Sequence, residues 1–342
     1  MTAGSLLLPP APESRARFDP GFGQRVLLTV DTEEEFDWNA PFRRDGYGLS
    51  HVAAIPRFQS FCEGVGAHPV YLVDWPIASD HQAVEIIGDA VRRGMAEVGV
   101  QLHPWVNPPF DEAVTTYNSF AGNLPSALEA DKFMRLRDTI EAAFGTAPLI
   151  YRAGRYGLGP GTADLLIRAG IRIDTSVRSL FDYSAQGGPD YNRHPLTPYW
   201  ADAGERLLEL PVTSVHWGLL RKLGRPLQRL GERVPRLLGG LARLSLLERI
   251  ALTPEGVPIE EAMRGIDIAL DSGLPVLVLS FHSPTLAHGH TPYARDAAAV
   301  EGVYEWLAAI YAELARRGVR SATVGDIIAA STTPLVSSRR AG

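Results

Sequence analysis

Short apolar runs alternate with longer amphipathic stretches along most of the chain. The runs are rich in valine, leucine and isoleucine, which is typical of buried β-strands. The longer stretches carry apolar residues at helical spacing, and several end in glycine, a common helix terminator. This alternation predicts parallel strands joined by helical crossovers. Strands are expected at 25–30, 68–73, 97–102, 148–151, 171–173, 207–210, 275–280 and 320–324, and helices include 83–94, 129–145, 161–170 and 301–318.

The predicted strand–helix units fit one large domain spanning residues 24–330. Such alternation builds either a distorted (β/α) barrel of about seven to eight parallel strands or a doubly wound open sheet. Strand order cannot be read from the pattern, so both architectures remain open at this point. Residues 1–23 and 331–342 are expected to be loose ends, and the basic, leucine-rich stretch 218–250 is expected to be a helical insertion.

Composition excludes several classes of function. The chain has 342 residues, of which 45% are hydrophobic, and its net charge of −6 lacks the basic excess of a nucleic-acid-binding protein. One cysteine, Cys62, allows no intrachain disulfide, which is consistent with a reducing compartment. The leucine run near the start is too short for a signal peptide, and no apolar stretch reaches the about 18 residues of a membrane span. We therefore expect a cytoplasmic location and no nucleic-acid partner.

Ionisable residues directly follow most of the predicted strands. In parallel α/β folds the carboxyl ends of the strands meet at one face, where binding and catalytic sites are built. We therefore expect these side chains to line one pocket. The residues at these positions are Asp31, Asp74, His103, Arg152, Asp174 and His282.

The acidic segment VDTEEEFDW follows the first predicted strand. Asp31 and Glu33 are two residues apart, so they point the same way in an extended chain. Two carboxylates in one pocket can have different roles. One can accept a proton while the other binds a cation or stays ionised. An acidic turn that caps the next helix is the alternative. Glu34 and Glu35 are expected to be mostly solvated.

The segment QLHPWVNPPF places His103 at a strand end, with Gln101 on the same strand face and Asn107 four residues later. A histidine combined with carboxylates from another strand can bind a metal. The alternative is a buried, hydrogen-bonded histidine in a packed loop.

Two further strand ends carry the remaining candidate groups. Arg152, in YRAGRYGLGPG, is expected to face the pocket and to hold Asp31 ionised and in place. His282 ends an apolar strand and is well placed for a general acid. For Arg155, a position in the pocket and a position on the protein surface are equally compatible with the sequence.

The candidate residues resemble, in their order along the chain, the motifs of the polysaccharide deacetylase family, also called the NodB-homology or carbohydrate esterase family 4-like group. The matching segments are VDTEEEF, GVQLHPW, YRAGRYG, the strand end at Asp174 and LSFHSP, which span roughly Val26 to Ile328. The resemblance implies a distorted barrel that hydrolyses an N- or O-acetyl group on a sugar with the help of a metal. By this resemblance Asp31 matches the general base, Arg152 the residue that orients it and His282 the general acid.

The metal-ligand set of that family is incomplete in this chain. Thr32 stands where the family has a second Asp, so Glu33 would have to bind the metal. Asn107 stands where the family has a second His, four residues after His103. The resemblance therefore implies a divalent ion, Zn²⁺ or similar, held by Glu33, His103 and Asn107, or else an enzyme that works without a metal.

The substrate implied by the resemblance is a saccharide. Sugar rings pack on aromatic faces, and Trp105 and Tyr156 near the strand ends, together with Asp74 and Asp174, are predicted to bind it. The stretch 218–250 is interpreted as a lid, or as a peripheral membrane contact that would suit a lipid-linked saccharide.

Two other functions remain open from the sequence. A glycoside hydrolase would use two carboxylates from the set Asp31, Glu33, Asp74 and Asp174. A saccharide-binding barrel without catalysis would explain the incomplete set of metal ligands.

Overall fold

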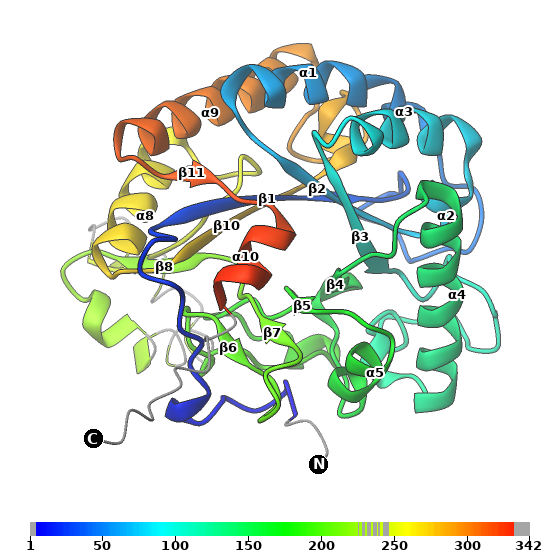
Figure 1. The fold of residues 1–342 in the computed structure, drawn as a ribbon, viewed down its shortest axis with the longest axis horizontal. Coiled ribbons are helices and arrows are strands. Elements are labelled where there is room, and N and C mark those ends of the chain that lie inside the picture. The colour runs from blue at the N-terminus through cyan, green and yellow to red at the C-terminus, as the bar shows by residue number, and fades with distance from the viewer. Residues whose placement is uncertain are drawn as a thin grey trace, which may run out of the picture.

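The predicted strands curl into a barrel-like sheet, which Figure 1 shows end-on. The computed structural model describes residues 5–331 except 225, 228–229, 231–233, 235–237, 239 and 242–245. The strands are β1 (Arg25–Thr32), β2 (Pro69–Val73), β3 (Glu97–Leu102), β4 (Ile150–Ala153), β5 (Ile173–Asp174), β6 (Tyr199–Trp200), β7 (Leu208–Glu209), β8 (Ser214–Trp217), β9 (Glu248–Ala251), β10 (Val276–His282) and β11 (Arg320–Ser321).

The order of the strands decides between a barrel and an open sheet. β10 pairs with β1, and β2, β3, β4, β5 and β7 follow in sequence order, all parallel. β6 joins β7 in antiparallel pairing, and β11 lies parallel to the start of β1. A doubly wound sheet would begin in its middle and grow both ways, whereas here the last long strand returns to the first. The predicted distorted barrel of parallel strands is confirmed.

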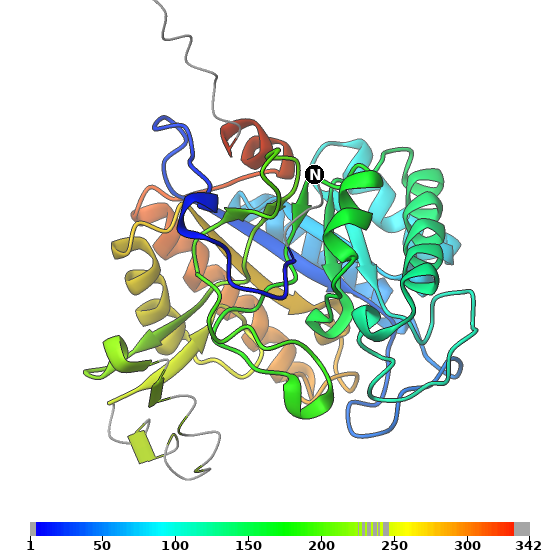
Figure 2. The same ribbon diagram turned by 90° about the horizontal axis from the view of Figure 1, so that it is seen from below.

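The barrel does not close, because the path of paired strands ends at β10 on one side and at β6, beside β7, on the other. The loops that follow β7 and β9 bridge this gap. The amide of Thr213 donates to the Val278 carbonyl at 3.3 Å, and its hydroxyl accepts from the Val278 amide at 2.8 Å. β8 and β9 form a separate antiparallel pair at this side of the molecule (Figure 2). The helical insertion predicted for 218–250 is wrong for residues 248–250, which belong to β9. Parts of that stretch lie outside the described residues.

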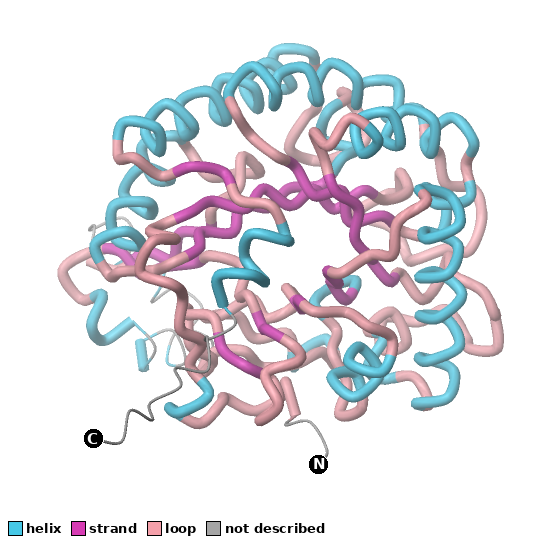
Figure 3. Tube along the Cα trace, viewed as in Figure 1, coloured by secondary structure: helices cyan, strands magenta, loops and turns pink. Residues whose placement is uncertain are grey.

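Helices cover the outer face of the sheet, as the ring of helical segments in Figure 3 shows. Among the described residues no helix combines the length and the hydropathy of a membrane-spanning segment. The helices are α1 (Ile55–Val65), α2 (Trp75–Ser79), α3 (His81–Arg92), α4 (Ser126–Phe144), α5 (Thr162–Arg168), α8 (Ile259–Asp271), α9 (Ala297–Arg316) and α10 (Val324–Ser331), with 3-10 turns at Pro12–Ser14, Ser50–Ala54, Ala121–Asn123, Gly154–Tyr156, Ser184–Gln186, Arg221–Leu223 and Ser283–Leu286.

Local sequence signals set several of the helix ends. The Asp80 carboxylate accepts a hydrogen bond from the Ala83 amide at 2.8 Å and so caps the start of α3. Gly145 ends α4 in the left-handed conformation, with φ of 71°, which glycine adopts without a steric penalty.

The side chains that face the barrel interior change from apolar to polar along each strand. Successive residues of a strand alternate between its two faces, so Leu27, Thr29 and Asp31 of β1 share the inner face. On the neighbouring β10, Val278 and Ser280 follow the same order. Leu27 and Val278 pack in one buried cluster, whereas Thr29, Asp31 and Ser280 all contact the same arginine higher up. The carboxyl end of the barrel is therefore its polar end.

The opposite end of the barrel is closed by α10, which lies across it in Figures 1 and 2. Val324 and Ile327 of α10 belong to the same apolar cluster as Leu27 at the base of the barrel. The N-terminal lead-in, expected to be loose, is packed here over its described residues, because Ala16 joins this cluster and the Asp19 amide donates to the Ala330 carbonyl at 2.9 Å. Of the expected loose tail 331–342, Ser331 is instead a buried residue of α10, and residues 332–342 lie outside the described residues.

Truncating Ile327 should test this closure. We expect Ile327→Ala to lower the free energy of unfolding by about 2–5 kcal/mol, because the side chain is fully buried and its loss leaves a cavity. Urea denaturation measures the change. Ile328→Ala, in a half-buried position of the same helix, is the matched control, and an equal loss in the two variants would contradict the proposed packing.

Candidate active site

A pocket of about 390 Å³ opens at the polar, carboxyl end of the barrel. Its floor includes five of the predicted residues, brought together from β1, β3, β4 and β10 and their ends: Asp31, Glu33, His103, Arg152 and His282. Its walls are largely aromatic and include Phe36, Trp38, Phe42, Trp105, Tyr156, Tyr183 and Tyr293.

Arg152 and Asp31 form a buried ion pair in this floor. The guanidinium Nη1 donates to Asp31 Oδ1 and to Ser280 Oγ, the latter at 2.7 Å, while Nη2 donates to Thr29 Oγ1 at 2.9 Å. Its Nε donates to the Thr175 carbonyl at 3.1 Å. With every nitrogen engaged, the guanidinium holds the Asp31 carboxylate in one position.

His282 lies beside Asp31, because the two residues are register partners at the ends of β10 and β1. Its Nε2 is 3.8 Å from Asp31 Oδ2, and its Nδ1 is 2.8 Å from Glu255 Oε2. Burial alone would lower the pKa of His282, but the carboxylates of Glu255, Glu33 and Asp31 raise it to about 10. The imidazole is therefore charged at neutral pH and can donate a proton.

Glu255 is a member of the site that the sequence reasoning missed. It lies in the loop after β9, and its Oε1 accepts hydrogen bonds from the His282 amide at 3.1 Å and from Thr285 Oγ1 at 2.5 Å. Three donors on the β10 end thus fix this carboxylate against the imidazole. No strand-end signal marks Glu255, since β9 itself was not predicted.

Glu33, Gln101 and His103 form a second polar group next to Asp31. Glu33 Oε2 lies 3.0 Å from Gln101 Nε2 and 3.4 Å from His103 Nε2, and the two nitrogens are 3.3 Å apart. Glu33 Oε1 and Gln101 Oε1 are buried and accept no hydrogen bond from the described residues. Burial, reinforced by Glu34 and Asp31 and opposed by His282 and His103, raises the pKa of Glu33 to about 8.

This second group has the chemistry and the spacing of a cation site. Ligand atoms that share one small divalent ion lie about 3.0–3.5 Å apart, which matches the spacing of these three side chains. A half-turn of the Gln101 amide places its oxygen where Nε2 lies, and Glu33 Oε1 is a further free acceptor. Glu33, His103 and Gln101 could therefore hold a divalent cation.

The structure was compared with solved structures of other proteins. It aligns with a protein of Mycobacterium smegmatis described as a polysaccharide deacetylase, with a TM-score of 0.53 and 15% sequence identity, over 97% of this chain and 94% of that one. The chain has the fold of the polysaccharide deacetylases. The predicted resemblance to that family is thereby confirmed for the fold.

Two further structures align at lower scores. A protein of Pseudomonas aeruginosa described as a polysaccharide deacetylase gives a TM-score of 0.48 and 13% identity, over 94% of this chain and 93% of that one. A 4-alpha-glucanotransferase of Thermococcus litoralis gives 0.48 and 15%, over 91% of this chain and 41% of that one. At the level of sequence, no family model and no curated protein matches the chain.

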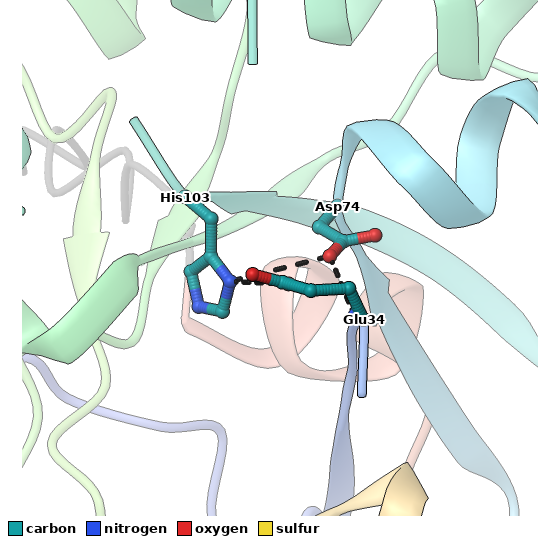
Figure 4. A group of neighbouring side chains, drawn as sticks. All are labelled: Glu34, Asp74 and His103. Atoms are coloured by element: carbon teal, nitrogen blue, oxygen red, sulfur yellow. Dashed lines mark hydrogen bonds and ion pairs between the residues drawn. The ribbon is translucent and has the colours of Figure 1, made fainter. Parts of the chain in front are cut away.

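Behind His103, this deacetylase-like barrel contains two buried acidic residues, Glu34 and Asp74 (Figure 4). Glu34 Oε2 is 2.9 Å from His103 Nδ1, and Glu34 Oε1 accepts from Trp105 Nε1 at 2.7 Å. Asp74 Oδ2 accepts the Glu34 amide at 2.9 Å, and Oδ1 accepts the Ile77 amide at 2.9 Å as the cap of α2. The expectation that Glu34 is solvated was wrong, because the carboxylate is turned inward onto the histidine.

These three side chains offer an alternative metal site. One ligand atom from each of Glu34, Asp74 and His103 lies within 4.8 Å of the others. However, all four carboxylate oxygens are already in hydrogen-bond contacts, and burial raises the pKa of both acids, which disfavours their charged forms. Glu34 then acts on the pocket through His103, because its contact with Nδ1 turns Nε2 toward Glu33.

Asn107 and Asp174 lie outside the pocket of the deacetylase fold. The Asn107 amide donates to the Lys132 carbonyl at 3.0 Å, and Lys132 Nζ in turn donates to the Pro104 carbonyl at 2.9 Å, so this asparagine anchors its loop to α4. Asp174 is fully buried and faces Glu209, its register partner on β7. Burial raises the pKa of Asp174 to about 6. The structure brings neither residue, nor Asp74, to the pocket surface.

A serine, a histidine and a glutamate beside the pocket have the spacing of a nucleophilic triad. His51 Nε2 is 2.8 Å from Ser283 Oγ, and His51 Nδ1 is 3.0 Å from Glu35 Oε1, so Glu35 is not the solvated residue that was expected. Ser283 is fully buried, and its Oγ accepts the Glu33 amide at 3.3 Å. The group therefore fixes the end of β1 and offers no accessible nucleophile.

Proposed function

We propose that the protein is a hydrolase that removes an N-acetyl or other acyl group from an amino-sugar-containing saccharide or glycoconjugate. The observation that carries this proposal is the pair Asp31 and His282, whose side chains meet at 3.8 Å in the pocket floor. Each is held by a group of opposite charge, Asp31 by Arg152 and His282 by Glu255. This arrangement presents a base and an acid to one bond.

The chemistry assigned to this pair is the hydrolysis of an amide. The Asp31 carboxylate takes a proton from a water molecule as the oxygen of that water attacks the acyl carbon. The His282 imidazolium gives its proton to the amine nitrogen as the carbon–nitrogen bond breaks, so the products are a carboxylic acid and a free amino sugar. Positioned proton transfers of this kind contribute about 10²–10⁴-fold each.

The proposal includes metal assistance at Glu33, His103 and Gln101, with Gln101 in place of the Asn107 predicted from the sequence. A bound divalent ion would polarise the acyl carbonyl and lower the pKa of a water molecule. Elemental analysis of the purified protein should find about one divalent ion per chain, and Gln101→Leu should lower this content while Asn107→Leu should not. Equal metal content in the two variants would contradict the assignment.

Acetate release is the direct test of the proposed function. A panel of N-acetylated mono- and oligosaccharides is incubated with the native protein, with and without added divalent ions. We expect acetate and free amine in equal amounts from at least one member of the panel. No acetate from any member, with metals supplied, would overturn the proposal.

A glycoside hydrolase remains the second candidate because two carboxyl groups of different character line the pocket. Asp31 is paired with a cation, whereas the pKa of Glu33 is raised to about 8, so a base and a protonated acid lie side by side. This function predicts new reducing ends without acetate. Saccharide binding without release of either product would instead support a binding protein.

A further inference from the structure

Two arginines in the pocket wall form no ion pair with an acid in the part of the chain that the structure describes. Arg155 and Arg178 both line the pocket, and neither forms an ion pair with any acidic side chain of the described residues. Arg152, by contrast, is paired with Asp31 in the floor. An arginine that lies in a pocket without an acid is a ready partner for an anion, because its fork of N–H groups matches carboxylate and phosphate oxygens.

Aromatic rings hold the Arg178 guanidinium in place. Its central carbon lies 3.9 Å from the centre of the Phe181 ring and 5.3 Å from that of Tyr156. Its Nη1 donates weakly to the Tyr183 hydroxyl at 3.3 Å, while its Nε is buried and donates to none of the described residues. The charge is thus positioned but not neutralised, and donor capacity remains.

Arg155 is fixed in the same way. Its central carbon lies 4.2 Å from the centre of the Phe120 ring and 5.1 Å from that of Phe42. Its nitrogens donate to neutral oxygens, including Ser119 Oγ at 2.5 Å and the side chain of Gln186. The backbone of Arg155 adopts the left-handed conformation, with φ of 54°, which a non-glycine residue adopts at a cost.

The acidic groups in the floor of the pocket are bonded to other residues. Asp31 is paired with Arg152 and Glu255 with His282, while Glu33 lies beside Gln101 and His103. The charge of Glu255 also acts on Arg178, although no ion pair joins these two residues among those described. Asp37 is exposed at the edge of the pocket. Among the described residues, the two partly buried guanidinium groups of the wall therefore have no directly bonded counter-ion, which a buried charge ordinarily requires.

We propose that the saccharide carries an anionic substituent, a carboxylate or a phosphate, which Arg178 and Arg155 bind while the acyl group lies over Asp31 and His282. This inference rests on the proposed function and names the class of its substrate. It assigns specificity to a wall of the pocket that takes no part in the proton transfers.

The test compares three forms of one N-acetylated saccharide: neutral, oxidised to a uronic acid, and phosphorylated. We expect kcat/KM of the native protein for the better anionic form to exceed that for the neutral form by at least about tenfold. The larger of the two anionic values identifies the oxyanion. If the neutral form is turned over as well as both anionic forms, the inference is overturned while the proposed function stands.

Substitution of Arg178 should reduce this preference. We expect Arg178→Met to lower the ratio of anionic to neutral kcat/KM by about tenfold to a hundredfold, as loss of a charged hydrogen bond does. Arg178→Lys should restore part of the ratio, a readout that a merely structural role would not give. Arg135→Met, on the exposed face of α4, is the matched control and should leave the ratio unchanged.

Binding measurements keep the inference testable if no form releases acetate. In that case the proposed function fails, and calorimetric titration of the native protein with the three saccharides decides. Tighter binding of an anionic form, lost in Arg178→Met, would support the inference. Equal affinity for the three forms would overturn it.

Discussion

Asp31→Asn is expected to lower kcat for acyl release by about 10²–10⁴-fold, the usual contribution of a positioned general base. The amide keeps the size of the carboxylate but takes up no proton at neutral pH. It also leaves the Arg152 guanidinium without its counter-ion in a buried site, which should lower the free energy of unfolding by about 3–5 kcal/mol. Initial rates of acetate release and urea denaturation measure the two effects.

Asp37→Asn is the matched control for this substitution. Asp37 also lines the pocket but is exposed and forms no ion pair with the described residues, so neither rate nor stability should change appreciably. A folded Asp31→Asn variant with undiminished kcat would show that the base lies elsewhere. Glu33 would then be the candidate, since its carboxyl group also lies in the floor.

Glu255→Gln should move the alkaline limit of activity to lower pH. His282 must be protonated to act as an acid, and its pKa of about 10 keeps it so over most of the alkaline range. An opposite charge at this distance raises a pKa by about 1–3 units, so its removal should shift the fall of kcat/KM toward neutral pH by that amount. The pH profile of kcat/KM measures the shift.

The same group links pH to stability. Because the pKa of His282 is raised from 6.5 to about 10 in the folded protein, the stability it contributes is complete below about pH 6.5 and is lost as the pH rises toward 10. In Glu255→Gln the pKa of folded His282 is lower, so this loss should be smaller and should end at a lower pH. Glu260→Gln, an exposed residue of α8, is the control, and identical pH profiles in the two variants would remove Glu255 from the proposed mechanism.

The floor of the site could be predicted because it follows from strand ends alone. Asp31 and His282 end two apolar runs 251 positions apart, and parallel pairing of those runs makes them register partners. Arg152 follows from the same argument on β4. Side chains alternate between the two faces of a strand, and this alternation decides which residues point into the barrel. The inward-facing residues are therefore apolar near the start of each strand and polar near its carboxyl end.

The remaining features depend on contacts that no local pattern encodes. Glu255 follows the two short strands β8 and β9 in the sequence. Its role depends on the folding of its loop against the end of β10, where the carboxylate accepts a hydrogen bond from the His282 amide. Asn107 has the spacing of a ligand, but Lys132 on a distant helix captures its loop. Asp174 ends a strand as predicted. However, the adjacent β7 places Glu209 next to it, and both side chains are buried.

Because α10 closes the base of the barrel, it determines by which end substrate and products reach and leave the pocket. Leu27, Val278 and Ile327 fill the lower interior as members of one buried apolar cluster. The pocket opens at the opposite, carboxyl end, so we expect water, saccharide and the released acid to use this opening, and a long glycan to enter it sideways or by one of its ends. The two products then leave one after the other, and the aromatic walls around this opening control that step.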